Sequence, residues 1–467
     1  MKKMVEKSPF EDVDSVRLNM GHLKIWFTSG MGFFTDAYDL FIIGVVLILL
    51  TGPFATSFHL DIVESALIGT SALAAAILGQ LIFGRLADIF GRKKVYGIEA
   101  TILAIGAILS AFSPSFIFLF LTRFLLGIGI GGDYPVSATI MSEYSNTKDR
   151  GKLIGLVFAN QGIGSVVAVA VGVVSVVALP ADLAWRFMLA FGAIPALAVI
   201  YLRRKLPETP RYSLLVNNDT NVAEKAKEVV GIKDAEKVKA SIKVSSFSMF
   251  IRSYWKTLMI TMSTWFMLDI AYYGTGIYSS PIVSNILPVT SLPMKVLIAG
   301  LPFMVGFFGY FTAVALLDKL GRKTIQIQGF FMMAILYIVV SSVMITKGVK
   351  VVGFIIPVDL AFLLYALTFF FIDFGPNQTT FILPAELFPV KYRTTGHGLS
   401  AAAGKTGAAI STLLFPALLL EIGIKELLLL LGVISIIGGL TSFFLKEPMR
   451  KSLEEASNEK LVVEVPS

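Results

Sequence analysis

The sequence lacks cysteine altogether and has few histidines, and both absences narrow what the protein can be. Without cysteine there is no disulfide, no thiolate nucleophile and no cysteine-ligated metal. The three histidines, His22, His59 and His397, are too few to favour a zinc site built from protein side chains alone. No Ser-His-Asp arrangement is visible, and the glycine run Gly127–Gly132 follows an apolar helix rather than a strand. These absences predict a protein that is not an enzyme and needs no metal or cofactor.

Charge is also scarce: 15% of the 467 residues are charged, whereas 55% are hydrophobic. A soluble protein would carry about a quarter charged residues. The apolar residues form long runs, and a membrane-spanning helix needs about 20 of them. About twelve runs meet this criterion, and they begin near Trp26, Ile62, Val95, Ser115, Lys152, Leu183, Trp255, Ser291, Thr324, Val352, Thr394 and Lys425. This pattern predicts an all-α protein embedded in a lipid bilayer.

The cations that give the net charge of +8 lie in alternate loops. They occur at 85–94, 148–152, 319–323 and 391–393, and the short loops that alternate with these are nearly free of Lys and Arg. Cytoplasmic loops of membrane proteins are enriched in Lys and Arg, so both termini are expected in the cytoplasm. The charge is thus explained without nucleic acid. The polar segment Met1–Lys24 lacks the features of a cleavable signal peptide.

The longest polar interruption, about 203–256, divides the predicted spans into two sets of six. We therefore predict a cytoplasmic segment (1–23), a first six-helix bundle (24–203), a central cytoplasmic loop (204–254), a second bundle (255–446) and a cytoplasmic tail (447–467). The tail is polar, and we expect it to be partly disordered.

A short motif recurs at equivalent places in the two halves. GRLADIFGRK (Gly84–Lys93) follows the second predicted span, and DKLGRK (Asp318–Lys323) follows the eighth. Two such halves around a central loop are typical of transporters built from repeats. Topology alone explains the cations but not the acids. We predict that Asp88, Arg92, Asp318 and Arg322 latch one conformation.

These motifs support a resemblance. GRLADIFGRK resembles the loop signature of the major facilitator superfamily, and PETPR (Pro207–Arg211) resembles the motif that ends the sixth helix of its sugar-porter-like branch. The order of segments agrees over essentially the whole chain. The resemblance implies an all-α membrane protein of twelve transmembrane helices, arranged as two six-helix bundles around a cavity that opens alternately to each side.

Six charged residues fall inside predicted spans, where a charge costs about 2.5–3.5 kcal/mol on insertion scales. A buried ion pair could account for one or two of them, but we expect most to serve transport. They are Asp36, Asp39, Asp133, Asp269, Asp373 and Lys405. The i, i+3 spacing of the first two places both on one helical face, where two carboxylates do not both ionise readily and one can carry a proton. The alternative is that Asp36 lies near the interface as a cap.

The seventh span places Trp265, Asp269 and Tyr273 on one face, which suggests a polar site rather than packing alone. Lys405, in the eleventh span, could neutralise an aspartate or attract an anion. Its Gly-Lys-Thr context lacks the spacing of a nucleotide loop. Arg123 is the only arginine placed well inside a predicted span, and we expect it to pair with an acid or the backbone.

A narrower resemblance follows from three runs. GGDYPVSATIMSEYSNTKDRG (Gly131–Gly151) resembles the fourth-helix signature of the phosphate:proton symporter family, and 374–389 and 397–408 resemble its tenth and eleventh helices. The resemblance implies phosphate ligands at Tyr134, Gln161, Trp265, Asp269, Tyr273 and Asn377. It also implies proton handling at Asp36, Asp39 and Asp133, with Lys405 as charge partner. Asp373 departs from the family, in which an amide is usual, and this leaves the proton stoichiometry open.

We therefore expect a plasma-membrane transporter, monomeric, that imports inorganic phosphate by proton symport, with arsenate as the closest analogue. Asp269 would be protonated when phosphate binds, because two bare negative charges repel. Two alternatives stay open: a sugar:proton symporter, suggested by PETPR, and an organic-anion carrier. A sugar site usually needs several amides in one helix, and the seventh span has none.

Overall fold

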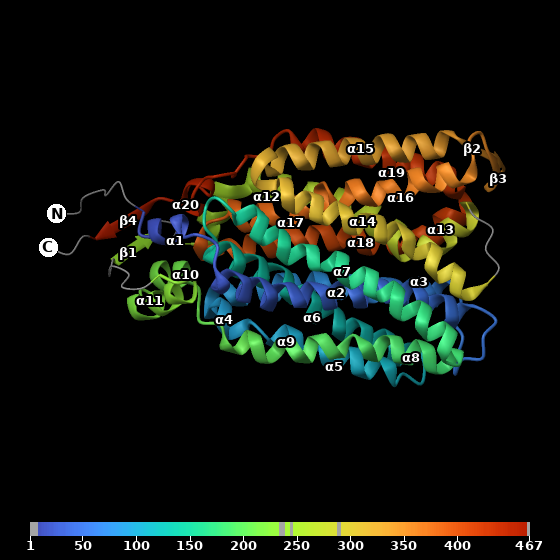
Figure 1. Ribbon diagram of the computed structural model, residues 1–467, viewed down its shortest axis with the longest axis horizontal. Helices are drawn as coiled ribbons and strands as arrows, with labels where there is room; N and C mark the ends of the chain where they lie inside the picture. The colour runs from blue at the N-terminus through green and yellow to red at the C-terminus, as the bar shows by residue number, and fades with distance from the viewer. Residues whose placement is uncertain (1–7, 233–238, 243–245, 287–290, 465–467) are drawn as a thin grey trace.

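The computed structural model describes residues 8–232, 239–242, 246–286 and 291–464. Long helices run side by side along the longest axis, and both chain ends lie at the same end of the bundle (Figure 1). We call this the terminal end and the opposite one the far end. The first half of the chain (blue to green) and the second half (yellow to red) form two neighbouring bundles.

The first bundle is built from helices with clear start signals. Asn19 accepts hydrogen bonds from the backbone N–H groups of Gly21 and His22, and Asp61 and Glu64 form a capping box. The helices are α2 (Met20–Thr51), α3 (Ile62–Phe90), α4 (Arg92–Val95), α5 (Ile98–Ala111), α6 (Phe116–Tyr144), α7 (Arg150–Ala178), α8 (Ala181–Phe191) and α9 (Ala193–Lys205). A break at Gly192 separates the last two within a single predicted span.

The second bundle repeats this plan. Its helices are α12 (Phe247–Ile277), α13 (Ser279–Ile286), α14 (Leu292–Leu320), α15 (Arg322–Ser342), α16 (Val358–Asp373), α17 (Pro376–Leu387), α18 (Arg393–Glu421) and α19 (Gly423–Ser442), with the short 3₁₀ helix η1 (Val390–Tyr392). Across the bundles α3 packs on α18 and α7 packs on α14, so the second long helix of each half meets the fifth long helix of the other.

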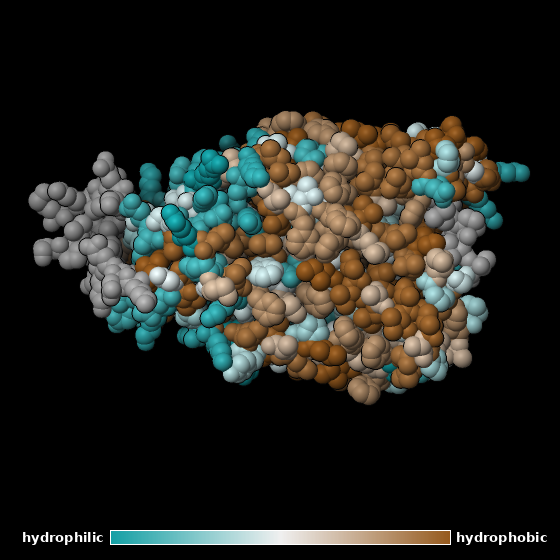
Figure 2. Space-filling view, viewed as in Figure 1, coloured by the Kyte–Doolittle hydropathy of each residue, from teal (hydrophilic) through white to brown (hydrophobic). Residues whose placement is uncertain are grey.

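Among the described residues, eleven helical segments are long and apolar enough to cross a membrane. Helix α12 is the twelfth: it has 31 residues, but its Thr, Trp and Tyr side chains lower its mean hydropathy. An apolar band covers much of the middle of the bundle, whereas polar side chains gather toward the terminal end (Figure 2). Phe112 and Phe444 are about three-quarters exposed, at 74% and 75%. Such a surface is suited to lipid, and the protein is a multi-pass membrane protein of twelve helices.

The predicted tenth span was misplaced at its start. Val352 lies in a hairpin of β2 (Met344–Lys347) and β3 (Lys350–Phe354), turned at Gly348, whose φ of 61° suits glycine. The spanning helix begins later, at Val358. A short β-branched apolar run cannot be distinguished from helix by hydropathy alone, which explains the error.

Smaller elements cover the terminal end. They are α1 (Glu11–Ser15), α10 (Pro210–Leu215), α11 (Thr220–Val229), α20 (Leu453–Ala456), β1 (Lys239–Ile242) and β4 (Leu461–Glu464). β1 of the central loop and β4 of the tail pair antiparallel, with Ala240 opposite Val463. The tail therefore has regular structure up to Glu464, because the central loop supplies a pairing partner. The expectation of partial disorder is not tested for 465–467, which lie outside the described residues.

Candidate functional site

The centre of the molecule holds a buried ion pair between two helices of the second bundle. Lys405 Nζ on α18 donates to Asp269 Oδ2 at 2.9 Å and to Tyr273 Oη at 3.0 Å, both on α12. All three side chains are almost inaccessible to solvent. Lys405 Nζ also lies 4.8 Å from the ring centroid of Tyr134, on α6 of the first bundle. The cation thus lies where the bundles meet.

Trp265 lies one turn before Asp269 on the same face of α12, as predicted. Its ring packs against Gly404, where any larger side chain would collide with the indole. The glycine next to Lys405 therefore allows α18 to approach α12 closely. Ring centroids of Trp265 and Tyr134 are 6.3 Å apart, so the indole borders the same site.

A chain of neutral hydrogen-bonding groups crosses from one bundle to the other beside this pair. Gln161 Nε2 donates to Tyr134 Oη at 2.6 Å, and Tyr310 Oη donates to Gln161 Oε1 at 3.2 Å. Asn377 Nδ2 donates to Tyr310 Oη and to Asp373 Oδ1, each at 2.7 Å. The structure thus brings together all six residues predicted to bind substrate. Tyr310 and Asp373 join them.

This arrangement can bind an anion. One ammonium supplies positive charge, and phenol, indole and amide groups supply neutral donors. There is no bidentate arginine clamp among these residues, so an anion would not be held as tightly as in a binding protein. The described residues contain no group of three or more His, Asp or Glu side chains that could hold a metal ion.

Aromatic side chains close the site toward the terminal end. Phe158 stacks on Phe381 with ring centroids 4.3 Å apart, and Phe33 lies edge-on to Phe381 at 4.9 Å. Phe33 also contacts Tyr134 edge-on at 5.0 Å. These residues come from α2, α7 and α17, so both bundles contribute to the barrier.

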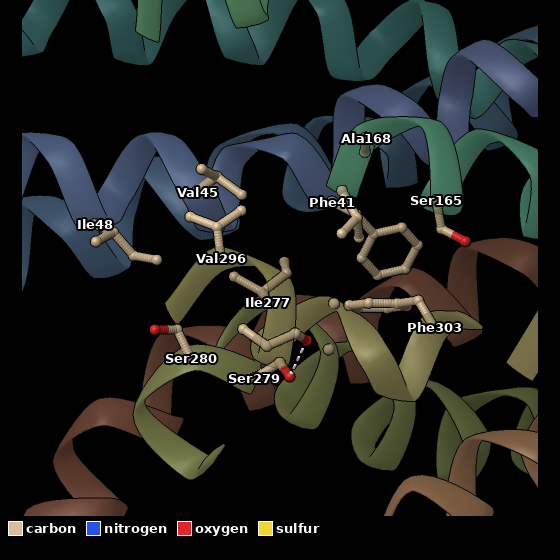
Figure 3. Close-up of a pocket in the computed structure, with 15 residues that line it drawn as sticks. Phe41, Val45, Ile48, Ser165, Ala168, Ile277, Ser279, Ser280, Val296 and Phe303 are labelled. Atoms are coloured by element: carbon tan, nitrogen blue, oxygen red, sulfur yellow. Dashed lines mark hydrogen bonds between the residues drawn. The ribbon is translucent and has the colours of Figure 1, made fainter. Parts of the chain in front are cut away.

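Toward the far end the barrier is thinner. Phe41 lies parallel to Tyr273, with ring centroids 5.9 Å apart, and packs on Phe303 at 4.6 Å. Beyond them is a narrow, mostly apolar cavity of about 30 Å³ between the bundles, lined also by Ile48 and Val296 (Figure 3). It has room for only a few water molecules. Two phenyl rings therefore separate this cavity from the polar site.

Asp36 and Asp39 are fully buried on α2, and no carboxylate oxygen of either has a hydrogen-bond partner among the described residues. Asp36 lies within electrostatic range of both Asp133 and Tyr134, so it stands between two polar clusters. Arg123 Nη2 donates to the backbone oxygen of Asp39 at 2.7 Å. The predicted pairing of Arg123 with an acid or the backbone is confirmed.

Asp133 belongs to a separate cluster inside the first bundle. Arg203 on α9 donates to Asp133 Oδ2 at 2.7 Å and to Glu99 Oε1 at 2.8 Å. Arg203 lies in the last turn of α9, which continues to Lys205, and its side chain is nevertheless buried. The sequence placed Arg203 at a loop boundary, where hydropathy could not separate it from the exposed cations beside it.

At the terminal end, the first of the repeated turns joins the two bundles. Asp88 accepts hydrogen bonds from the backbone N–H groups of Thr394 and Thr395, at 3.3 and 2.7 Å, in the first turn of α18. Arg92 pairs with Asp88 at 3.3 Å and with Glu143 at 3.1 Å. Glu143 also pairs with Arg393 of the second bundle at 2.9 Å. An acid at a helix N-terminus interacts favourably with the helix dipole.

The second turn makes the equivalent contacts in the opposite direction. Asp318 accepts hydrogen bonds from the backbone N–H groups of Gly151 and Lys152, at 3.1 and 2.7 Å, at the start of α7. Arg322 pairs with Asp318 at 2.7 Å and with Glu386 at 2.8 Å, and Arg150 of the first bundle pairs with Glu386 at 2.7 Å. Two related sets of ion pairs thus hold the terminal end closed.

The central loop and both terminal segments reinforce this closure. Arg211 of α10 pairs with Asp14 at 2.7 Å and with Glu454 of α20 at 2.8 Å. The guanidinium of Arg211 lowers the pKa of Glu454 against the opposing effect of burial. Glu459, which accepts a hydrogen bond from the Val390 backbone N–H, has its pKa raised to about 7 by burial, although Arg393 opposes this.

Comparison with known proteins places the chain in a family. The model of the sugar (and other) transporter family matches residues 26–459. This chain belongs to the sugar (and other) transporter family. Inorganic phosphate transporter 1-11 of Oryza sativa subsp. japonica is 39% identical over 511 residues, which cover 96% of this chain and 89% of the relative. Low affinity inorganic phosphate transporter 1 of Petunia hybrida is 37% identical, and the match covers 96% of this chain and 94% of the Petunia protein.

The fold of this family member agrees with solved structures. The major facilitator superfamily proton:xylose symporter XylE, bound to 6-bromo-6-deoxy-D-glucose, superposes with a TM-score of 0.79. The match covers 94% of this chain and 99% of XylE, at 19% identity. The predicted membership of the major facilitator superfamily and its twelve-helix fold are confirmed. At this identity the likeness to XylE establishes the fold alone.

Several residues of the site escaped the sequence analysis. Tyr310 is missing from the prediction, as are the aromatic barriers of Phe33, Phe158 and Phe381 toward the terminal end. A tyrosine just after Gly306 and Gly309 in an apolar span was the available signal for Tyr310. Phenylalanine is so frequent in this chain, at 37 residues, that no pattern distinguishes the barrier residues from ordinary packing.

Proposed function

We propose that this transporter imports inorganic phosphate by proton symport and alternating access. The observation that carries the proposal is the Lys405–Asp269 pair at the meeting of the bundles, 2.9 Å long and bordered by neutral donors. The relatives that match nearly the whole chain are named as inorganic phosphate transporters, and this supports the same substrate. Phosphate accepts hydrogen bonds at four oxygens, which suits Tyr134, Gln161, Trp265, Tyr273 and Asn377.

The proposed coupling of proton and phosphate follows from a competition between phosphate and Asp269 for the ammonium group of Lys405. An anion that binds Lys405 must compete with Asp269, which also accepts its hydrogen bond. Protonation of Asp269 removes the competing charge, so proton and phosphate favour each other's binding. Loss of that proton restores the ion pair and displaces phosphate. In this scheme Asp36, Asp39 and Asp133 carry protons between solvent and the site.

We assign the terminal end to the cytoplasm and the membrane to the plasma membrane. Exposed cations such as Lys93, Lys94 and Lys152 gather at that end, which agrees with the positive-inside rule. The latches of Asp88–Arg92 and Asp318–Arg322 then close the cytoplasmic side, while Phe41 and Phe303 cover the site from outside. Import requires the latches to open while Phe41 and Phe303 keep the outer side of the site closed. We expect the protein to work as a monomer and to accept arsenate.

A counterflow experiment tests which substrate the protein carries. Proteoliposomes loaded with unlabelled phosphate should take up external radiolabelled phosphate, and arsenate should compete whereas xylose should not. K405Q should abolish this exchange. K425Q is the matched control, because Lys425 donates to the Met344 backbone oxygen at the far end, away from the site. Native protein that exchanges xylose but not phosphate would exclude the proposed substrate.

A further inference from the structure

Asp373 occupies an unusual place in the second bundle. It is the last residue of α16, and α17 begins at Pro376, so a spanning segment is broken directly after the carboxyl group. Gly375 between them has φ −142° and ψ −124°, outside helical geometry. Interrupted spanning helices are the segments that bend in transporters and line their sites. The carboxyl group therefore lies at a joint of the bundle.

Neutral groups surround this carboxyl group. Its exposed fraction is 2%, and Oδ1 accepts from Asn377 Nδ2 at 2.7 Å. Oδ2 faces Gly306 of α14, where any larger side chain would collide with it. The other titratable groups that face it are the phenols of Tyr310, Tyr272 and Tyr273. The described part of the chain offers Asp373 no ion pair, in contrast to Asp269. A buried carboxylate without a cation is strongly disfavoured unless it holds a proton.

Asn377 links this carboxyl group to the substrate. Its Nδ2 has two hydrogens, and one is donated to Asp373 and the other to Tyr310. A phosphate oxygen that accepts from Asn377 must therefore displace one of these partners. If Asp373 were ionised, a phosphate that displaced it from Asn377 would leave two negative charges side by side, the carboxylate and the phosphate itself. If Asp373 holds a proton, it can donate that proton in a hydrogen bond instead.

We propose that Asp373 is a second proton-binding site, separate from Asp269, and that its proton travels with phosphate. The inference rests on the proposed function and specifies its stoichiometry. An O–H bond forms at Asp373 when the site faces the outside and breaks when it faces the cytoplasm, so the proton comes from one aqueous phase and leaves to the other. Two protons accompany each phosphate monoanion, and each cycle moves one net positive charge inward.

The test is the reversal potential of phosphate flux. Proteoliposomes with fixed phosphate and pH gradients are clamped with potassium and valinomycin, and the potential of zero net flux gives the number of charges moved. The native protein should move one positive charge per phosphate. D373N, which keeps an acceptor oxygen for Asn377, should become electroneutral. D359N is the matched control, because Asp359 lies exposed in the first turn of the same helix, and it should keep the native value.

The outcomes separate the two proposals. Native protein that transports no phosphate would overturn the proposed function and this inference together. Phosphate transport with an electroneutral native cycle would overturn only the second proton, and this result needs no variant, so a D373N protein that fails to fold does not prevent the decision. Electrogenic transport that D373N leaves unchanged would also contradict the role of Asp373.

Discussion

The hydroxyl of Tyr310 joins polar groups of the two bundles. It donates to Gln161 of the first bundle and accepts from Asn377 of the second. Removing it in Y310F leaves a buried donor and a buried acceptor without a partner, which costs about 1–3 kcal/mol. Phosphate then no longer has to displace Tyr310 from Asn377, so we predict that the half-saturating phosphate concentration falls, about tenfold for each 1.4 kcal/mol that the phosphate-free site loses. Initial uptake rates measured over a range of phosphate concentrations check this.

Y365F provides the control. Tyr365 is also buried in the second bundle, but its hydroxyl has no hydrogen-bond partner among the residues that the structure describes. The control should therefore leave the half-saturating concentration unchanged. An equal effect of Y310F and Y365F would show that the hydroxyl bridge has no part in binding.

Charged residues inside apolar runs were predictable from the sequence, because burying a charge in a membrane costs free energy. Asp269, Lys405 and Asp36 stand out because charges in apolar runs are rare, and the structure buries all three. Tyr310 was not predictable, because tyrosine is tolerated in apolar spans and its role depends on contacts with α7 and α17. Arg203 and Glu99 were missed for a related reason: each lies near a helix end, where charge is ordinary.

The repeated turns act through helix ends rather than through side-chain pairs alone. Asp88 and Asp318 each bind the first-turn N–H groups of a helix in the opposite bundle, α18 and α7. In D88N the charge that interacts with the α18 dipole is lost, at a cost of about 0.3–1 kcal/mol. The equilibrium constant that favours the closed form over the open one should therefore fall by a factor of about two to five. We predict a shift toward a form that is open at the terminal end.

Distances between spin labels measure this shift. The chain has no native cysteine, so K94C and K446C place one label on each bundle at exposed positions. Pulsed electron spin resonance should show a larger fraction of long distances in D88N than in the parent. D149N is the control, because Asp149 contacts Asn146 within the first bundle. An unchanged distribution in D88N would argue against the latch.

The strand pair of β1 and β4 is predicted to respond to pH through Glu459. Burial raises the pKa of this carboxyl group to about 7 from 4.5, so the docked tail favours the protonated form. The docked state is then fully favoured below about pH 4.5 and loses this stability as the pH rises through about 7. Hydrogen exchange of the β4 backbone amides should be faster at pH 8 than at pH 6, beyond the intrinsic change. E459Q should abolish the excess, and E455Q, at an exposed residue, should retain it.

The elements with long apolar runs were predictable, whereas short irregular ones were not. Twelve spans and their order follow from hydropathy, and the two Gly-Arg-Lys turns follow from repetition. The β2–β3 hairpin was taken for helix because Val351, Val352 and Phe354 are as apolar as a span. Pairing of β1 with β4 joins segments more than two hundred residues apart, and no local pattern reports such a partner.

The two bundles meet in a polar centre that is closed unequally. Ion pairs, helix ends and the paired strands close the terminal end, whereas two rings and a narrow cavity lie toward the far end. Opening the terminal end must break many contacts together, so the transition requires the driving force of substrate and proton binding. In the proposed cycle, the protonation of Asp269 decides whether phosphate can bind and so drive this transition.

Proton-driven accumulation of phosphate tests the central claim most directly. Native protein and D269N are reconstituted into liposomes, and uptake of radiolabelled phosphate is followed with an inward proton gradient, without one, and with a protonophore. Our account predicts that the native protein concentrates phosphate only with the gradient, and that D269N does not concentrate it under any condition. Accumulation by D269N equal to that of the native protein, or native uptake indifferent to the gradient, would contradict it.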